Sequence, residues 1–247
     1  MPVTTVTTAN NILNRVAAEI GVNPVTDAYS TPDATFVQLR YLLNTAGEEL
    51  VQAYEWELLT KEHTITTSSL DSGDYDLPTD FLYMINQTGW ERANNMPLFG
   101  PLTPQDWQYL LGRDLVNSTI YASFRFQEGY FRIFPQPPPD NLDIHFEYIS
   151  KNWVSDAGMP PTYKDNVDAA TDIPLYDKTL ISRYVKLKFL ESKGFDTTKA
   201  QDDFNQTFSF LTGRDKGAKI LNAGMGYIGY PYLNAWRNLP DTGYGSP

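Results

Sequence analysis

The chain has 247 residues, no cysteine and a net charge of −11, with 19 Lys and Arg against 30 Asp and Glu. These numbers exclude disulfide bonds, thiolate catalysis and cysteine-based zinc sites, and they disfavour specific DNA binding, because an acidic protein repels a phosphate backbone. The first eleven residues lack a basic segment followed by an apolar one, and no stretch approaches eighteen uninterrupted apolar residues, so we expect a soluble, unprocessed protein without a membrane span.

The N-terminal part of the sequence has the apolar spacing of two helices. The first is expected from about Thr8 to Ile20, where Gly21 can end it in the left-handed region. The second is expected from Pro32 to about Leu59, with Thr31 as N-cap. Its apolar positions recur in steps of three and four residues: Phe36, Leu39, Leu43, Ala46, Leu50 and Ala53. We expect residues 1–59 to form the first part of a helical domain.

After residue 59 the pattern changes to that of strands and turns. Residues 61–67 and 82–86 are rich in side chains that favour strands, and a cluster of aspartates separates them. Thr103 and Pro104 open a short helix that ends near Gly112. The chain therefore enters a β region that carries one helix.

The clearest strand signal lies in residues 119–135. Apolar and polar side chains alternate there on both sides of the turn 127–129, which predicts a β-hairpin. Residues 142–148 alternate in the same way and predict a further strand with one solvated face. We expect residues 60–160 to form an inserted antiparallel sheet or small sandwich.

Helical spacing returns in residues 161–216. One helix is predicted by Ile173, Tyr176, Leu180, Tyr184 and Leu187, and Gly194 ends it. A second helix, capped by Asp196 or Thr197, carries Ala200, Phe204, Phe208 and Leu211. The simplest architecture packs both helix pairs as one antiparallel bundle that is discontinuous in sequence, with the β domain inserted between them. The expected fold class is α+β.

The last segment, residues 217–247, differs in composition from the rest. It holds six glycines, three prolines, four tyrosines and Trp236, with only three charged side chains. Such a segment cannot form a core of its own, yet it is too aromatic for an ordinary solvated linker. We expect an extended tail that lies on the surface of a partner.

Two short motifs could suggest a chemical site. Residues 224–229 match G-x-G-x-x-G, but a dinucleotide site needs this motif between a strand and a helix, whereas here it follows a helix pair and precedes Pro231. His63 and His145 are the only histidines, on predicted strands and without a second histidine at ligand spacing, and no serine lies in a G-x-S-x-G turn. We assign no cofactor, no metal and no catalytic residue.

Two groups of carboxylates leave a second interpretation open. A calcium site could involve Asp71, Asp74, Asp76 and Asp80. Their spacing lacks the D-x-D-x-D-G order and the late glutamate, so a polar turn is favoured. A glycosidase acid and base could lie among Glu48, Glu49, Glu55 and Glu57. A solvated helix face is favoured there, because catalysis also needs a cleft and two separated pKa values.

Aromatic residues make up 14% of the chain, and many lie outside the stripes that a core would use. Aromatic side chains are enriched at the buried centres of protein interfaces. We therefore expect burial between subunits and assign to a ring or tail interface Trp90, Trp107, Tyr109 and Trp153. The alternative is that most of these rings fill the core of a sandwich.

The order of these features resembles the head-to-tail adaptors of tailed bacteriophages, the connector rings beneath the portal, particularly in short-tailed phages. The resemblance covers most of the chain. It is carried by the segments LLNTAGEELVQAYEWELL, YDLPTDF, PLTPQDWQYL, FRIFPQPP and IHFEYIS and by the closing helix pair with its Gly/Tyr-rich tail. These are packing patterns rather than chemical signatures.

The resemblance implies a non-enzymatic virion protein, assembled in the host cytoplasm, that forms a homo-oligomeric ring, commonly a dodecamer. This ring would dock on the portal protein and give the tail nozzle protein its platform. Residues 217–247 would be the portal-docking segment, anchored by Tyr227, Tyr230, Tyr232, Trp236, Arg237 and Tyr244. DNA would pass through the channel without specific binding, because an acidic wall does not hold a polyanion.

Two other classes of protein stay open at this point. One is a phage tail-associated cell-wall or glycan hydrolase that uses a carboxylate pair in the β region, and the other is a carbohydrate- or receptor-binding tail accessory protein. Some adaptors have been credited with wall hydrolysis, but no residues in this sequence can be assigned to it. Purified protein separates these classes. An adaptor should form a ring with portal and show no hydrolytic activity, whereas a hydrolase should be a monomer that loses activity when one carboxylate is removed. A carbohydrate- or receptor-binding sandwich should be a trimer.

Overall fold

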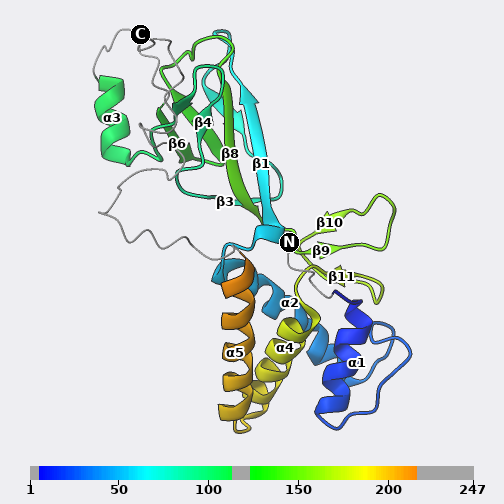
Figure 1. Ribbon diagram of the computed structural model, residues 1–247. Coiled ribbons are helices and arrows are strands. Elements are labelled where there is room, and N and C mark those ends of the chain that lie inside the picture. The colour runs from blue at the N-terminus through cyan, green and yellow to red at the C-terminus, as the bar shows by residue number, and fades with distance from the viewer. Residues whose placement is uncertain (1–5, 113–122, 216–247) are drawn as a thin grey trace, which may run out of the picture.

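The computed structural model describes residues 6–112 and 123–215 and shows a protein of the α+β class (Figure 1). Within these ranges the order of elements is helical at both ends and mostly β in the middle. Four helices pack together at one end of the molecule, and two of the three sheets lie at the other end with helix α3 (Pro104–Gly112) beside them. The fold class expected from the sequence is confirmed.

The helical part joins segments from both ends of the chain. Its helices are α1 (Ala9–Glu19), α2 (Ala34–Ala53), α4 (Lys178–Lys193) and α5 (Thr198–Asp215). Helix α4 contacts each of the other three, and α1 also contacts α2. Helices α1, α2 and α4 supply fully buried side chains, whereas α5 adds only the partly buried Phe204, Phe208 and Leu211. The predicted helices from the two ends of the chain thus share one core.

Helix α2 carries the expected apolar stripe but is shorter than expected. Its N-cap is Asp33 rather than Thr31, because the Asp33 carboxylate accepts hydrogen bonds from the backbone N–H groups of Thr35 (2.7 Å) and Phe36 (3.4 Å). The helix ends at Ala53, which is exposed and does not belong to the buried stripe.

The early end of α2 is explained by Trp56. Its indole N–H donates to the carbonyl of Leu50 at 2.7 Å and so satisfies one of the carbonyl groups that a helix end leaves without a partner. The chain turns at Tyr54, which is extended, and residues Glu57–Leu59 form a short 3₁₀ turn rather than a continuation of α2. The folded-back Trp56 is buried in the helical core.

Helix α4 begins at Lys178 and not at Ile173 as expected. Asp177 is its N-cap and accepts from the N–H of Thr179 at 2.8 Å, whereas residues Ile173–Pro174 form strand β11. The end of the helix is as predicted, because Gly194 adopts the left-handed conformation with φ of +70°.

A small sheet near the junction was not predicted. Strand β9 (Val154–Ser155) pairs with β10 (Tyr163–Lys164) on one side and with β11 (Ile173–Pro174) on the other. Strands of two residues have no measurable alternation, so the sequence pattern cannot indicate them. This sheet leads the chain from the β part into α4.

The β part contains two antiparallel sheets. The larger has β8 (Asp143–Ser150) between edge strand β1 (Thr60–Thr66) and the short strands β3 (Phe81–Met84), β4 (Trp90–Glu91) and β5 (Met96–Pro97). The smaller is formed by β2 (Asp74–Asp76), β7 (Tyr130–Phe134) and β6 (Ser123–Gln127). The predicted hairpin is β6–β7, and its turn residues Glu128 and Gly129 both have positive φ, as a two-residue hairpin turn requires.

Stacked phenylalanine rings join the two sheets. Phe124 and Phe131 stack with ring centroids 4.9 Å apart, and Phe131 stacks on Phe146 of β8 at 5.1 Å. Strand β8 contributes Phe146 to this core, and at its other end it contributes Ile149 to the helical core. One strand therefore belongs to both cores.

Shortly after β8, Trp153 packs into the helical core. Its side chain is fully buried and stacks on Tyr176 with ring centroids 5.9 Å apart. The indole lies directly on the backbone of α2 at Gly47, where an added Cβ would be 2.1 Å from the indole Cζ2. The Tyr176 hydroxyl donates to the carbonyl of the same Gly47 at 3.4 Å. Only glycine leaves room for this contact.

We predict that Gly47→Ala lowers the free energy of unfolding by about 3 kcal/mol, because the new methyl group forces the buried indole out of its position. Urea unfolding followed by tryptophan fluorescence measures this. Gly213→Ala in α5 is the matched control, since a Cβ there meets nothing within 4 Å; it should raise stability by about 0.5–1 kcal/mol. Equal effects of the two substitutions would contradict the role given to Trp153.

Candidate assembly surfaces

Two of the four side chains expected at a subunit interface are buried within the chain itself. Trp153 lies in the helical core with no exposed surface, and Trp107 of α3 is 3% exposed and meets Phe134 edge-on, with ring centroids 6.4 Å apart. A ring that is already buried has no surface left for another subunit. The interface assignment of Trp107 and Trp153 is therefore wrong, and the core alternative holds for both.

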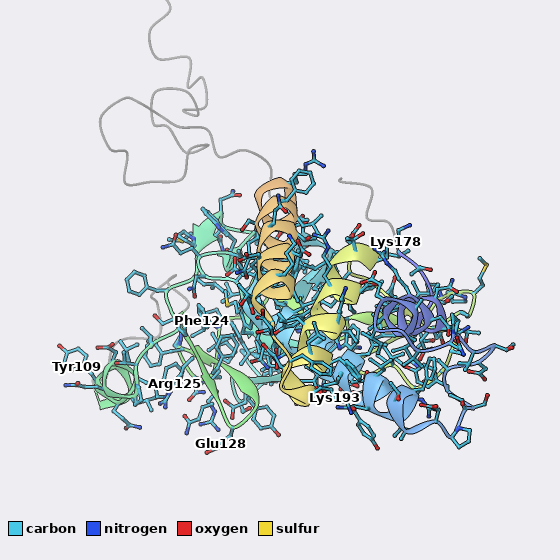
Figure 2. All side chains as sticks on the ribbon, turned by 90° about the horizontal axis from the view of Figure 1, so that it is seen from below. Tyr109, Phe124, Arg125, Glu128, Lys178 and Lys193 are labelled. Carbon is cyan, nitrogen blue, oxygen red and sulfur yellow. The ribbon has the colours of Figure 1, made fainter. Side chains whose placement is uncertain are left out.

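The other two expected interface side chains are accessible. Trp90 is half-buried on β4, where it pairs with His145 of β8 and with Pro97 of β5. Tyr109 of α3 is 55% exposed. Figure 2 shows Tyr109 at the outer edge of the molecule, on the side away from α4. These two residues come from different elements, β4 and α3.

Helix α3 places large apolar side chains in solvent. Thr103 starts the helix: its hydroxyl accepts from the N–H of Asp106 at 3.2 Å and donates to the Asp106 carboxylate at 2.6 Å. In the described part of α3 only Trp107 is buried, whereas Tyr109 and Leu111 are exposed. Phe99, just before the helix, is 70% exposed. We call Phe99, Tyr109 and Leu111 the α3 surface.

Further exposed apolar side chains are scattered over the described residues. They include Tyr41, Leu70, Met159, Tyr163, Phe195 and Phe210. Tyr163 is one of the aromatic residues outside the predicted apolar stripes, and the other five were not singled out from the sequence. Phe210 shows why, because it stands between Phe208 and Leu211 and differs from them only in the direction of its side chain. Single exposed apolar residues are common, so these do not define a site by themselves.

The residues expected to anchor the tail lie outside the described residues. They are Tyr227, Tyr230, Tyr232, Trp236, Arg237 and Tyr244. The G-x-G-x-x-G motif at residues 224–229 also lies outside them. The described chain ends at Asp215, the last residue of α5. Its carboxylate accepts a hydrogen bond from the N–H of Glu57 at 2.9 Å.

The two histidines lie on neighbouring strands, as expected, but on opposite faces of the sheet. His63 pairs with Phe146, and His145 pairs with Thr64, and successive residues of a strand point in opposite directions. His63 meets the Phe146 ring edge-on at 5.4 Å, whereas His145 lies between the carboxylates of Glu62 (3.1 Å) and Asp143 (3.0 Å). Burial lowers the pKa of His63. The two imidazoles do not converge.

Three of the four aspartates of the turn have separate partners. Asp71 accepts from the hydroxyl of Tyr75 at 2.9 Å, and Asp74 pairs with Arg132 at 3.2 Å. Asp76 is exposed on β2. Within residues 6–112 and 123–215 no group of three or more His, Asp or Glu side chains is arranged to hold a metal ion. This arrangement favours the polar turn over the calcium site.

Asp80, the fourth of these aspartates, fixes the start of β3 to the larger sheet. Its carboxylate accepts from Lys61 Nζ at 2.6 Å, from the Ser150 hydroxyl at 2.7 Å and from the Tyr148 hydroxyl at 3.0 Å. Burial by itself raises the pKa of Asp80, but these three donors outweigh it, and the pKa lies below its ordinary value of 3.8. The ionised carboxylate is thus the form that the fold stabilises.

Of the four carboxylates expected on one helix, Glu49 is engaged in packing contacts, whereas Glu55 and Glu57 lie beyond the end of α2 at Ala53. Glu49 accepts from Lys188 at 2.7 Å and from the hydroxyl of Tyr184, both on α4. A hollow between α1, α4 and α5 is lined by charges that pair with each other, with Lys186 on Glu19 at 3.1 Å and Lys199 on Asp203 at 2.7 Å. The Lys186–Glu19 pair joins α4 to α1, whereas Lys199–Asp203 lies within α5, and together they leave little net charge for a ligand.

The described residues thus expose apolar side chains at the α3 surface and at scattered positions elsewhere. None of the described helices is both long and apolar enough to cross a membrane. The profile of the SU10 adaptor protein family matches residues 7–219, which include both helical segments and the whole β part. The chain belongs to the SU10 adaptor protein family.

Family membership makes this chain a bacteriophage adaptor-type protein with a structural role in the virion. It agrees with the resemblance seen in the sequence at the level of a phage adaptor. It also favours a structural adaptor over the hydrolase and the receptor-binding protein. No curated protein matches the chain.

We predict that Asp80→Asn lowers the free energy of unfolding at pH 7 by about 1–3 kcal/mol, because Lys61 and two hydroxyl groups lose an ionised acceptor. A carboxylate with a lowered pKa stabilises the fold above its unfolded pKa and loses this effect as pH falls through the folded pKa. The difference between variant and wild type should therefore shrink below about pH 4. Urea unfolding between pH 3 and pH 7 measures it, and Asp76→Asn, on the exposed strand β2, should have little effect.

Proposed function

We propose that this protein is a head-to-tail adaptor that forms a ring beneath the phage portal and provides the platform for the tail nozzle. The observation that carries the proposal is the family match over residues 7–219, together with the order of sequence features that resembles short-tailed phage adaptors. The ring would be a homo-oligomer, dodecameric as the resemblance implies. DNA would pass through its channel without specific binding, which the net charge of −11 favours.

A ring requires two different patches on each subunit, because a head-to-tail contact repeats until it closes. The α3 surface supports one of them, since Phe99, Tyr109 and Leu111 are large and exposed near one another in sequence. Figure 1 places α3 at one side of the β part, remote from the helical core. Trp90 and Tyr109 remain candidates for this ring or tail contact, and Trp107 supports it only by holding α3 in place.

The proposed portal-docking segment begins at a fixed point of the fold. The last turn of α5 is tied to the end of α2 by the Tyr54 hydroxyl, which donates to the carbonyl of Thr212 at 3.2 Å, and by the Asp215 carboxylate. The family match ends at residue 219, so docking by residues 217–247 rests on the composition of this segment and on the resemblance. A segment that becomes ordered on binding gives up conformational entropy, so it should become fixed only once the portal is present.

We predict that a chain ending after Lys216 folds but loses portal binding, because both cores lie within the residues that it keeps. Co-sedimentation with purified portal rings measures binding, and thermal unfolding checks the fold. In the full-length chain, exchanging Tyr227, Tyr230, Tyr232 and Trp236 for serine should lose most of the binding, whereas exchanging the three tyrosines for phenylalanine should keep it. Unchanged portal binding by the shortened chain would remove the docking role of the tail.

We predict that Phe99→Ser combined with Leu111→Ser reduces ring formation at least tenfold while the fold stays intact, because both side chains are exposed in the single chain. Native mass spectrometry of the adaptor with portal counts the copies. Leu70→Ser is the matched control, since Leu70 is 94% exposed in a turn outside the α3 surface. If the control and the double variant behave alike, the α3 surface is not a subunit contact.

A further inference from the structure

The outer edge of strand β1 has no partner strand among the described residues. The larger sheet has the order β1-β8-β4-β5, with β3 also paired to β8, so β1 is at its end. The pairing of β1 with β8 runs from Thr60 opposite Ile149 to Thr66 opposite Asp143 without a bulge. The edge is therefore a regular strand of seven residues.

The hydrogen bonds on both sides of β8 show which backbone groups of β1 point outward. The N–H of Thr67 donates to Leu142 at 3.1 Å, while on the far side of β8 the carbonyls of Asp143 and Glu147 accept at 2.9 Å from Arg92 and Ile85. Because successive residues of an antiparallel strand direct their N–H and C=O groups to opposite sides, the outward positions of β1 are Thr60, Glu62, Thr64 and Thr66. Thr60 already donates its N–H to the carbonyl of Glu57, so the open outward positions are Glu62, Thr64 and Thr66. In the described chain these backbone groups receive no hydrogen bond from another segment.

The fold covers the comparable edge of the other sheet. At β6 the N–H of Phe124 donates to the carbonyl of Phe99 at 3.0 Å, and the N–H of Leu102 donates to the carbonyl of Phe124 at 2.9 Å. Strand β1 lacks such a cover and has neither a proline nor a bulge, two of the means by which proteins block an edge. Charged residues are a third means, and of the two on β1 Lys61 is paired with Asp80 at 2.6 Å. An open edge of this kind accepts an extended strand through its backbone groups.

The chain contains a short segment suited to this edge. Residues 3–8 read VTTVTT, so that every residue is β-branched and uncharged, and the segment nearly matches β1 in length. Threonine pairs across neighbouring strands are favourable, and β1 has threonine at two of its three open outward positions.

The described end of this segment, residues 6–8, lies at the start of α1 of its own chain. Thr8 caps α1, and the Thr7 hydroxyl accepts from the side-chain amide of Asn11 at 3.1 Å. The N–H of Ala9 donates to the carbonyl of Asp172 at 2.7 Å, which fixes the base of the segment on the helical part. Val6 is 45% exposed and is not part of a strand.

We propose that residues 2–7 of a neighbouring copy add as a strand to the outer edge of β1. This inference rests on the proposed ring, because it requires a second copy of the chain. Each copy would give its N-terminal segment to one neighbour and accept a segment from the other. Such a head-to-tail contact uses two different surfaces of the subunit and closes into a ring.

The absence of cysteine allows a direct test by cross-linking. Full-length Thr4→Cys and Thr66→Cys variants, one carrying a tag that changes its size, are mixed with portal and treated with a short bismaleimide. The expected product is a covalent dimer of mixed size, with little dimer from either variant alone. Dimers formed by Thr66→Cys alone would show that the β1 edges of two copies pair with each other. A chain that carries both cysteines and is cross-linked only within itself would show that β1 pairs with the N-terminal segment of the same chain. Either result, or no cross-link, overturns the proposal.

A backbone substitution provides the second arm. In the Thr66→Cys chain, Thr64→Pro removes an outward N–H group without removing a hydrogen bond to β8, and it should reduce the yield of mixed dimer at least tenfold. Thr64→Val is the control, because it keeps the N–H group and should leave the yield unchanged. Equal yields would overturn the proposal. Native mass spectrometry of the same samples separates the strand exchange from the proposed function. Rings without the mixed cross-link would overturn the strand exchange alone. Mixed dimers without rings would support the strand exchange and contradict the proposed ring.

Discussion

The fold depends on the contact between the Trp153 indole and the backbone of α2 at Gly47. Trp153 follows β8, the central strand of the larger sheet, and its indole lies on α2 in the helical core, so this contact anchors the chain that leaves the sheet to the helices. Tyr176 stacks on the same indole, and Trp56 meets Tyr176 edge-on at 5.7 Å. Three large rings thus surround the second half of α2, and their close packing there requires a residue without a side chain.

Much of the fold could be predicted because local patterns and tertiary packing agree. The stripe on α2 is buried from Phe36 to Leu50, the β6–β7 hairpin turns where a Glu-Gly pair allows positive φ, and Gly194 ends α4. The errors fall where a distant contact decides the local structure. α2 stops at Ala53 because Trp56 folds back onto Leu50, and Tyr176 continues the spacing of α4 only because Trp153 buries it.

The candidate interface was harder to predict than the fold. Composition shows that aromatic residues are abundant, but it does not show whether a ring is buried by its own chain or by another. Trp107 and Trp153 fill cores, whereas Tyr109 and Phe99 are exposed, and no local pattern distinguishes these cases. The family match supplies the biological setting that the contacts alone do not: a phage adaptor, whose exposed apolar side chains have other virion proteins as possible partners.

Strand β8 has a mechanical consequence because it belongs to both cores. It is anchored by Phe146 in the β part and by Ile149 in the helical part, and Figure 1 shows it running from the junction into the sheet. The strands that lead into and out of the larger sheet, β1 and β8, are neighbours at the junction, where Thr60 lies opposite Ile149. A force that pulls the helical part away from the β part therefore acts on both strands in the same direction and does not shear the ladder between them. The load falls instead on the pairing of β8 with β3 and β4 and on the stack of Phe146 with Phe131 of the second sheet.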